Sequence, residues 1–277
     1  MRRPRSRRRR SRPRGPRASY REHHATATRA SRYAFAPVPA RLASLSFFFP
    51  ALNEEAHVRA IVDEALAVLP RFAEDLEVTV VDDGSTDRTG AIADEAAARD
   101  PRVRVIHHGR RRGYGGAIRS GLLAAKDDWI FYTDGDRQFA LEDLGRLIEA
   151  SGDADAVVGY RIKRADPVRR RFVAWVYNRL IRLLFGGGWR DVDCAFKLFR
   201  RDVFARVPLA RVRSNGAFFS PELLITLRHS GMRIRQVGVR HFPRTAGEEK
   251  GATPRVIARA IRDLFVLRAR FWSGRAS

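Results

Sequence analysis

The feature that most constrains the fold is an alternation of short apolar runs with stretches of helical periodicity between residues 42 and 158. Such runs are typical of buried strands, and the stretches between them are typical of helices packed on a sheet. The alternation predicts an α/β fold with a largely parallel, doubly wound sheet and helices on both faces. The expected strands are 45–49, 76–81, 103–106, 129–132 and 156–158, and the expected helices are 54–69, a stretch ending at residue 98, 118–125 and 141–150.

Polar side chains follow four of these expected strands, directly or in the connecting loop. Because such sheets bind ligands at the carboxyl ends of their strands, we expect the four groups to lie at one edge. Each group alone also fits turn or cap chemistry, and Asn53 is placed to cap the helix after it. The groups are Asn53 with Glu54, Asp82 with Asp83, Gly113 to Gly116, and Asp134 to Gln138.

Two carboxylates stand one residue apart where the fourth expected strand ends. Side chains alternate along an extended segment, so Asp134 and Asp136 point to the same side. With the amide oxygen of Gln138 they form an oxygen-rich group suited to Mg²⁺ or Mn²⁺, with room left for substrate phosphates. The alternative is a loop that only caps the next helix, since Asp-Gly-Asp is also ordinary turn sequence.

The glycine-rich segment Gly113-Tyr114-Gly115-Gly116-Ala117 follows the third expected strand and the run Arg110-Arg111-Arg112. That position is not the one of a dinucleotide-binding fingerprint. A tight turn is one interpretation. Glycines beside arginines also suit the close approach of a diphosphate.

Positive charge is concentrated in the first residues. The net charge is +23, and residues 1–41 hold fourteen Arg and one Glu, which leaves +10 for the rest. Residues 1–17 are nearly all Arg, Pro and Ser and bury too little surface to fold. Three interpretations stay open: a tail for nucleic acid or anionic membranes, a solvated appendage, or translation from a start that the cell does not use. The head has few aromatic residues to stack on bases, so we expect no nucleic-acid partner.

Other features of the composition bear on location. Cys194 is the only cysteine, which excludes a disulfide within the chain. No apolar run approaches the roughly 18 residues that cross a bilayer. The arginines of the head are not followed by the apolar stretch of a secretory signal. We therefore expect a cytoplasmic protein without a membrane span.

Four motifs follow one another along the chain: Phe49-Pro50-Ala51-Leu52-Asn53-Glu54-Glu55, Val81-Asp82-Asp83-Gly84-Ser85-Thr86-Asp87, Gly113-Tyr114-Gly115-Gly116-Ala117 and Asp134-Gly135-Asp136. In this order they resemble the motifs of family 2 glycosyltransferases, and within that family the dolichyl- and polyprenyl-phosphate sugar synthases. The resemblance extends over about residues 44–250. It implies a GT-A fold, a nucleoside-diphosphate-sugar donor, a divalent metal and inversion at the anomeric carbon.

Carried over by position, the resemblance assigns roles to single residues. It implies that Asp134, Asp136 and Gln138 hold Mg²⁺ or Mn²⁺ on the donor diphosphate. One departure is Arg137, which stands before Gln138 where relatives often have Gly or Leu; Gln138 itself is present, so the metal site is kept. The residues expected to bind the donor are Pro50, Asn53, Glu54, Asp82, Asp83, Gly113, Gly116 and Asp134.

Further motifs after residue 158 resemble the phosphate-binding parts of the family. Gly159-Tyr160-Arg161 resembles its Gly-x-Arg step, and residues 241–250 resemble its His-x-x-Arg-x-x-Gly-x-Ser-Lys loop, with Glu249 in place of Ser. Arg161, Arg244 and Lys250 would offset charge on an acceptor phosphate, although Arg161 also fits a solvated loop cation. Asp193 is a candidate for orienting the acceptor or the sugar, or else a turn acid. The residues expected to act in catalysis are Asp136, Asp193, Arg161, Arg244 and Lys250.

Two segments, 168–185 and 255–272, are basic and amphipathic and contain Trp. Each fits a helix packed on the core or a helix on a membrane surface with anionic lipids. We accordingly divide the chain into an Arg-rich head (1–41), a GT-A domain (42–252) and a C-terminal basic helix (253–277). If the acceptor is a lipid, we expect the chain to bind to the cytoplasmic face of the membrane as a peripheral protein.

The expected reaction is transfer of a hexosyl group from a GDP- or UDP-sugar to a polyprenyl phosphate. An ionised phosphate is already a nucleophile, so this acceptor needs no strong general base. A family 2 transferase acting on a saccharide or cell-wall hydroxyl is the alternative enzyme, with Asp193 as its base. An Arg-rich nucleic-acid-binding protein is the distant alternative. The sequence leaves the oligomeric state open.

Overall fold

The computed structural model describes residues 41–162, 168–244 and 254–273. The Arg-rich head up to residue 40 lies outside these residues, and so does Lys250.

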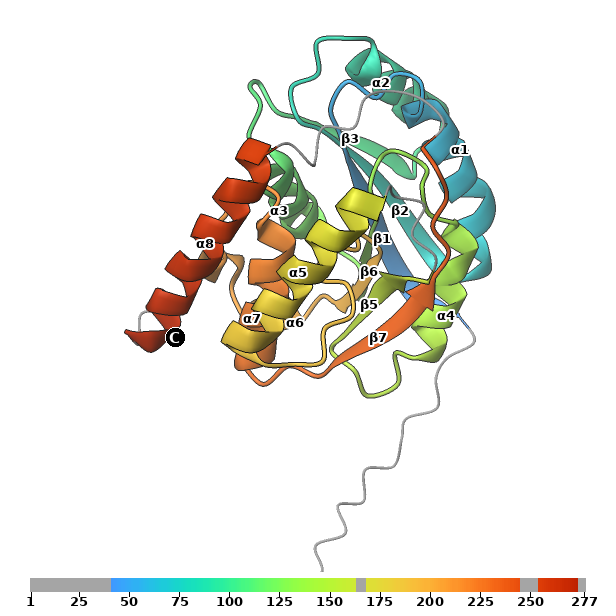
Figure 1. Ribbon diagram of the computed structural model, residues 1–277. Coiled ribbons are helices and arrows are strands. Elements are labelled where there is room, and N and C mark those ends of the chain that lie inside the picture. Colours follow the sequence, from blue (N-terminus) through green and yellow to red (C-terminus); the bar gives the residue numbers. More distant parts are fainter. Residues whose placement is uncertain (1–40, 163–167, 245–253, 274–277) are drawn as a thin grey trace, which may run out of the picture. The chain divides into compact units, whose positions relative to one another are not determined.

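A seven-stranded sheet forms the centre of this part of the chain (Figure 1). Its strand order is β3-β2-β1-β4-β6-β5-β7. Strand β6 runs antiparallel to both of its neighbours, and the other pairs are parallel. The strands are β1 (Leu42–Ala51), β2 (Ala73–Asp82), β3 (Val103–His107), β4 (Trp129–Tyr132), β5 (Ala156–Arg161), β6 (Lys197–Arg200) and β7 (Ile234–Val239).

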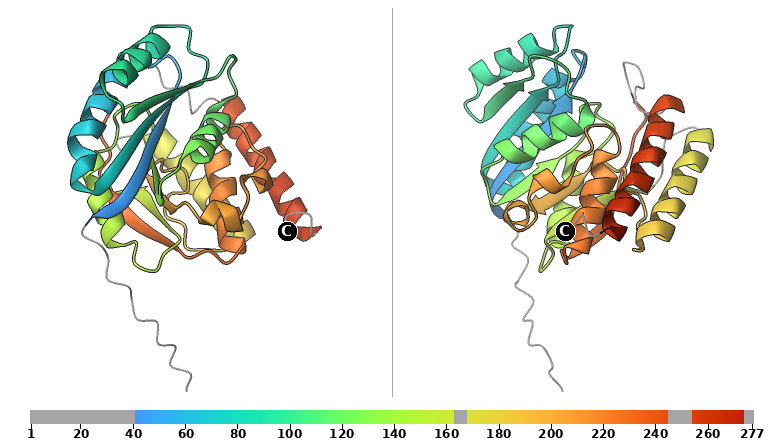
Figure 2. Two further views of the ribbon diagram at one scale, coloured as in Figure 1. Left: turned by 180° about the vertical axis from the view of Figure 1, so that it is seen from behind. Right: turned by 90° about the vertical axis from the view of Figure 1, so that its left-hand side faces the viewer.

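Helices cover both faces of the sheet (Figures 1 and 2). Helices α1, α2 and α4 lie on one face, and α3, α5, α7 and α8 lie on the other. The helices are α1 (Val58–Val68), α2 (Thr89–Arg99), α3 (Tyr114–Ala124), α4 (Leu144–Glu149), α5 (Val168–Phe185), α6 (Val203–Arg206), α7 (Phe219–His229) and α8 (Pro254–Trp272), with 3₁₀ turns at Leu69–Arg71, Leu141–Asp143 and Leu209–Arg211.

The elements expected from the sequence are present, and two local predictions were wrong. Asn53 does not cap a helix, because α1 begins four residues later than expected, at Val58. Asn53 has a left-handed φ of 51° and sits in the loop before the helix. The glycine-rich segment is not a separate turn, since α3 begins at Tyr114 and takes Gly115 and Gly116 into its first turn.

The core is centred on aromatic pairs between β1 and β4. Phe47 stacks on Phe131 and Phe48 stacks on Tyr132, each with ring centroids 5.3 Å apart. All four side chains are buried, because both faces of the central strands are covered by helices. Such pairs contribute about 0.5–1.5 kcal/mol each beyond their buried area. A Cβ at Gly121 of α3 would lie 2.2 Å from the Phe48 ring, so glycine there lets α3 pack directly on β1.

Because β6 runs antiparallel to β4 and β5, residues from both ends of this part of the sequence lie at one edge of the sheet. Lys197, the first residue of β6, pairs with Tyr132 at the end of β4 and with Val158 in β5. Residues that precede β6 therefore lie at the same edge as the residues that follow β4. This places the segment from Asp191 to Phe196 beside Asp134, although some sixty residues of sequence separate them.

Candidate active site

Asp134 and Asp136 leave the carboxyl end of β4 as expected, and both are partly buried. The Tyr114 hydroxyl donates to Asp134 Oδ1 over 2.9 Å, and the Gln138 backbone N–H donates to Asp136 Oδ1 over 3.2 Å. Tyr114 begins α3, so the glycine-rich motif and the Asp-Gly-Asp motif are in direct contact.

Burial raises the pKa of both carboxyl groups, and a neighbouring carboxylate adds to the effect: Asp136 for Asp134, and Glu54 for Asp136. The pKa of Asp134 is raised to about 7, first by burial and then by Asp136. The pKa of Asp136 is also raised, chiefly by burial. A divalent cation between two such carboxylates would offset the charge that burial and repulsion disfavour. The donor set therefore fits Mg²⁺ or Mn²⁺.

The predicted third ligand, Gln138, lies next to the pair but is tethered elsewhere by its nitrogen. Its Nε2 donates to the Phe242 carbonyl over 3.0 Å, after β7. The amide oxygen thus remains the candidate ligand. Among the described residues no group of three or more His, Cys, Asp or Glu side chains could hold a metal ion. With two protein carboxylates, other positions around a cation would be left to substrate oxygens and water.

Arg244 joins the donor motif to the metal motif. Its Nη2 lies 2.7 Å from both Glu54 carboxylate oxygens, and its Nη1 lies 3.7 Å from Asp136 Oδ2. The three side chains are at most 15 % exposed. The structure therefore brings together two predicted donor or metal residues and one predicted acceptor residue that is 190 positions from Glu54.

The remaining donor residues form the rim of the site through bonds to backbone groups. Asn53 Oδ1 accepts the Thr86 N–H over 2.8 Å, and Asp82 Oδ1 accepts the Ser85 N–H over 2.9 Å. The other Asp82 oxygen lies 3.1 Å from His107 Nδ1. Pro50 pairs with Val81 in the sheet. These residues lie at the predicted edge.

Asp83 is buried and shapes the loop before α3. Its Oδ1 lies 2.7 Å from His108 Nδ1 and accepts the Arg112 N–H over 2.8 Å, and its Oδ2 accepts the Gly113 N–H over 2.9 Å. Gly113 has a φ of 86°, in the left-handed region that favours glycine. Asp83 therefore fixes the path by which the chain enters α3, where Gly113 and Gly116 were expected to meet a diphosphate.

Arg161 is not a solvated cation. Its Nε and Nη2 donate to the two Asp191 oxygens over 2.6 and 2.8 Å, and both side chains are less than 10 % exposed. Burial alone would lower the pKa of Arg161, and the bonds to Asp191 raise it above its usual value. Burial raises the pKa of Tyr177, and the nearby Asp193 carboxylate raises it further. Asp191 and Asp193 both belong to the segment that precedes β6.

Sequence reasoning missed three residues of this edge: Tyr114, Asp191 and Lys197. Lys197 is fully buried, and its Nζ donates to the Cys194 carbonyl and to Ser220 Oγ. Its charge favours ionised Asp134. The sequence contained one signal for Lys197. It lies within the apolar run Phe196-Lys197-Leu198-Phe199, where the alternation of side chains along a strand places the lysine on a covered face of the sheet. Tyr114 and Asp191 had no such signal.

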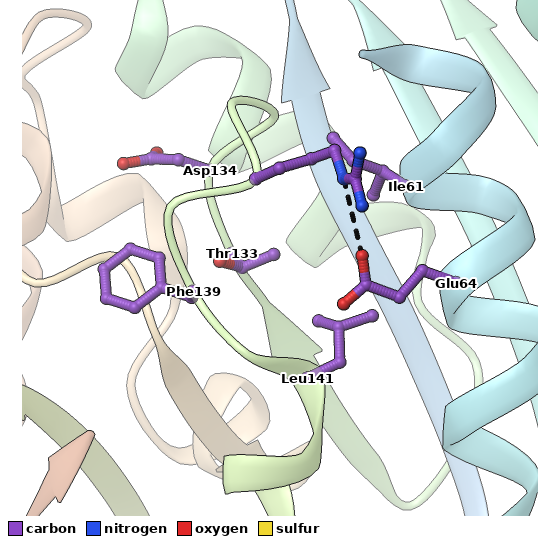
Figure 3. A pocket seen from close by; sticks show the side chains of 7 residues that line it. Ile61, Glu64, Thr133, Asp134, Phe139 and Leu141 are labelled. Atoms are coloured by element: carbon purple, nitrogen blue, oxygen red, sulfur yellow. Dashed lines mark ion pairs between the residues drawn. The ribbon is translucent and has the colours of Figure 1, made fainter. Parts of the chain in front are cut away.

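A small cavity lies behind the Asp-Gly-Asp loop (Figure 3). Arg137 has a left-handed φ of 57° and pairs with Glu64 of α1, with Nε 3.5 Å from Oε2. The Asp134 carboxylate points away from Glu64 in this view. Glu64 thus supports the unusual loop residue from α1. The cavity is lined by Ile61, Glu64, Thr133, Asp134, Arg137, Phe139 and Leu141.

The sequence model of glycosyl transferase family 2 matches residues 46–207, which is more than half of the chain. The chain belongs to this family. The predicted resemblance is thus confirmed, and with it the prediction that the protein is a glycosyltransferase.

Relatives in this family include proteins named for polyprenyl substrates. The chain is 32% identical over 182 residues to an undecaprenyl-phosphate mannosyltransferase of Micrococcus luteus, covering 63% of this chain and 75% of that protein. It is 31% identical over 220 residues to a polyprenol monophosphomannose synthase of Mycolicibacterium smegmatis, covering 73% and 78%. It is 36% identical over 210 residues to glycosyltransferase AglD of Haloferax volcanii, covering 72% of this chain but only 33% of that longer protein.

Solved structures with the same architecture include glucosyl-3-phosphoglycerate synthase of Mycobacterium tuberculosis. The TM-score is 0.63 at 20% identity, and the match covers 82% of this chain and 80% of that one. This likeness concerns the fold, and it confirms the predicted GT-A fold of this glycosyltransferase. Among the described residues, no helix is long and apolar enough to cross a membrane.

Proposed function

We propose that this family 2 glycosyltransferase moves a hexosyl group from a GDP- or UDP-sugar to a polyprenyl phosphate, with inversion and with a divalent metal. The observation on which the proposal rests is the contact of Arg244 with Glu54 and Asp136. It puts a cation suited to phosphate directly beside the carboxylates suited to a metal. Relatives named as polyprenyl-phosphate and polyprenol mannosyl transferases support the choice of acceptor.

Asp134 and Asp136 would hold the metal, with Gln138 as the third ligand. Solved structures of the same fold contain Mn²⁺ or Mg²⁺ together with UDP, which supports either ion here. When bound, such an ion offsets charge on a departing diphosphate as a Lewis acid. The Tyr114 hydroxyl would orient Asp134, and the Gln138 N–H would orient Asp136.

The donor would lie along the rim formed by Pro50, Asn53, Glu54, Asp82 and Asp83. Its diphosphate would meet the start of α3 at Gly113 and Gly116, where backbone N–H groups and the helix dipole favour an anion. Asp82 and Asp83 already accept hydrogen bonds from the protein. Their main part in binding would therefore be to shape the rim.

Arg244 would stabilise charge on the acceptor phosphate at the moment of transfer, with Lys250 as a second cation. Arg161 would act with Asp191, as a pair that holds its guanidinium in one orientation. An ionised phosphate oxygen attacks the anomeric carbon while the bond to the diphosphate breaks. Asp193 would orient the acceptor or the sugar.

Helices α5 and α8 would rest on anionic lipid at the cytoplasmic face of the membrane. They lie side by side (Figures 1 and 2). Both expose large apolar side chains among arginines, a composition suited to an anionic interface. The exposed apolar residues are Phe172, Trp175, Val176 and Leu183 on α5, and Ile261, Phe265, Val266 and Trp272 on α8.

The test uses the full chain with polyprenyl phosphate in detergent, Mg²⁺ or Mn²⁺, and radiolabelled GDP- and UDP-sugars. We expect metal-dependent label in the organic phase from one donor. Asp136→Asn should lower the rate at least about 100-fold, because a ligand of the charge-stabilising metal is lost. Asp202→Asn, which changes an exposed carboxylate directly before α6, is the matched control and should leave the rate unchanged.

Two outcomes would contradict the proposal. Nucleotide-sugar binding without label in the organic phase would keep the donor site and move the acceptor to a saccharide hydroxyl. If the chain neither binds a nucleotide sugar nor gives label in the organic phase, it has the family fold but not the proposed reaction.

A further inference from the structure

A buried glutamate on α7 organises the loop that precedes this helix. Glu222 is 1% exposed. Its Oε1 accepts the Arg213 N–H over 3.1 Å, and its Oε2 accepts the Ser214 N–H over 2.8 Å. Both donors belong to residues 209–216, which we call the bracing loop. Hydrogen bonds to a charged acceptor are stronger than those between neutral groups, so Glu222 fixes the path of this loop.

The bracing loop is also held by α3. Arg119 donates to the Leu209 carbonyl over 2.6 Å and to the Val212 carbonyl over 2.5 Å. The Gly115 N–H donates to the Asn215 carbonyl over 2.9 Å. The loop therefore touches α3 at its first turn and again one turn further along.

The contact with the first turn of α3 is unusually close. A Cβ at Gly113 would lie 2.7 Å from the Asn215 carbonyl oxygen, and a Cβ at Gly115 would lie 2.6 Å from Phe219 Cβ. Only glycine allows this approach at either position. A displacement of the bracing loop would therefore displace the start of α3, the point at which we place the donor diphosphate.

The far side of the bracing loop is tied to α8. Arg270 donates to Glu222 Oε1 over 2.8 Å and to the Arg211 carbonyl over 3.0 Å. Its side chain is 15% exposed, so this pair is largely shielded from solvent. Leu264 and Leu267 of α8 are buried as well. The C-terminal helix is thus connected through Arg270, Glu222 and the bracing loop to the first turn of α3.

We propose that Glu222 and Arg270 are positioning residues for the donor. Through these two residues, the affinity for the donor depends on how α8 packs against the bracing loop. This inference rests on the proposed function, because it takes the start of α3 as the diphosphate site. Neither residue needs to touch the substrate. Without the Arg270 guanidinium, Glu222 keeps a buried charge with less compensation, and the loop can shift.

The experiment measures binding of UDP and of GDP, each with Mn²⁺, to the full chain by calorimetry, and KM and kcat with polyprenyl phosphate. Arg270→Gln should weaken binding of the preferred nucleotide about tenfold, because small displacements of a binding group are costly. Its donor KM should rise by the same factor, while the acceptor KM and kcat stay within about twofold. Arg270→Lys should restore part of the affinity, since Lys keeps the charge but not the fork that reaches two acceptors.

A matched control is Arg206→Gln. Arg206 forms a bond of similar length, 2.7 Å, to the buried Asp155, which precedes β5 at the opposite edge of the sheet. Nucleotide affinity should be unchanged in this variant. Glu222→Gln should weaken nucleotide binding, as Arg270→Gln does. Thermal unfolding of each variant shows whether it is folded, and the Arg270 variants decide the question if Glu222→Gln does not fold.

The outcomes separate the inference from the proposed function. Unchanged nucleotide affinity in folded Arg270→Gln would overturn the inference and leave the function intact. An equal loss in Arg206→Gln would also overturn it, because the effect would then be general destabilisation. Failure of the unaltered chain to bind either nucleotide would overturn both.

Discussion

The two sides of the site stabilise their carboxylates differently. On the donor side, β1 to β3 and the loops after them, buried carboxylates accept hydrogen bonds from backbone N–H groups of neighbouring loops, as Asp82 and Asp83 do. On the acceptor side, β5 to β7 with α5 to α8, the charge of buried carboxylates is met by arginines as well: Asp191 pairs with Arg161, and Glu222 pairs with Arg270.

The difference bears on how each side responds to change. A backbone donor is held in place by the local path of the chain, and it has no charge to lose or to screen. An arginine comes from a distant part of the sequence, must be desolvated and leaves a buried charge behind if it is removed. We therefore expect the acceptor side to be the more sensitive to single substitutions, and the donor side to be the more robust.

The largest expected effect is on the acceptor side. Asp191→Asn breaks the bidentate pair with Arg161 and removes the carboxylate charge that this buried guanidinium pairs with. The free energy of unfolding should fall by about 3–5 kcal/mol in urea titrations. Asp153→Asn removes a partly exposed partner of Arg233 and Arg235 and should cost at most about 1 kcal/mol. Similar losses in the two variants would contradict the comparison.

A smaller effect is expected from the corresponding change on the donor side. Asp83→Asn replaces one acceptor oxygen with a nitrogen that faces an N–H group of His108, Arg112 or Gly113. The free energy of unfolding should fall by about 2–3 kcal/mol. Nucleotide affinity should fall as well, because the entry into α3 is displaced. Asp100→Asn, at an exposed local turn, is the control. A loss larger than that of Asp191→Asn would reverse the expected order.

The same difference explains what the sequence could predict. Residues that follow directly after a strand could be predicted, because the alternation of strands and helices was enough to place Asp82, Asp83, Asp134 and Asp136 at one edge. Asp191 required the antiparallel direction of β6, and the contact of Arg244 with Glu54 spans 190 positions. Local patterns contain no information on such pairs. The wrong cap at Asn53 has the same cause, since its side chain bonds to Thr86 in another loop.

A third prediction concerns the outer surface of the acceptor side. Phe172 and Trp175 are 63% and 58% exposed and their rings stack on each other. The double variant Phe172→Ser and Trp175→Ser should weaken flotation with phosphatidylglycerol-containing vesicles about tenfold, because apolar area no longer enters the interface. Its melting temperature should change by less than about 2 °C, since both side chains are exposed.

The control for this prediction is Leu123→Ser. Leu123 is 69% exposed, but it lies on α3, outside the two helices. It should leave flotation unchanged. Equal loss in both variants would mean that membrane binding is not a property of α5 and α8.

The smallest effect tests the donor side where it does use a charged partner. Hydrogen bonds to Asp94 and then to Asp82 raise the pKa of His107. A raised folded-state pKa stabilises the protein fully below the unfolded value of about 6.5, and the contribution is lost as the pH rises through the folded value. The melting temperature of the unaltered chain should therefore exceed that of His107→Gln by about 1–2 °C at pH 5.5. The gap should close by pH 8.5. A melting-temperature difference that does not change with pH would show that His107 acts by packing. The stability of the donor side would then not depend on a charged partner at this position either.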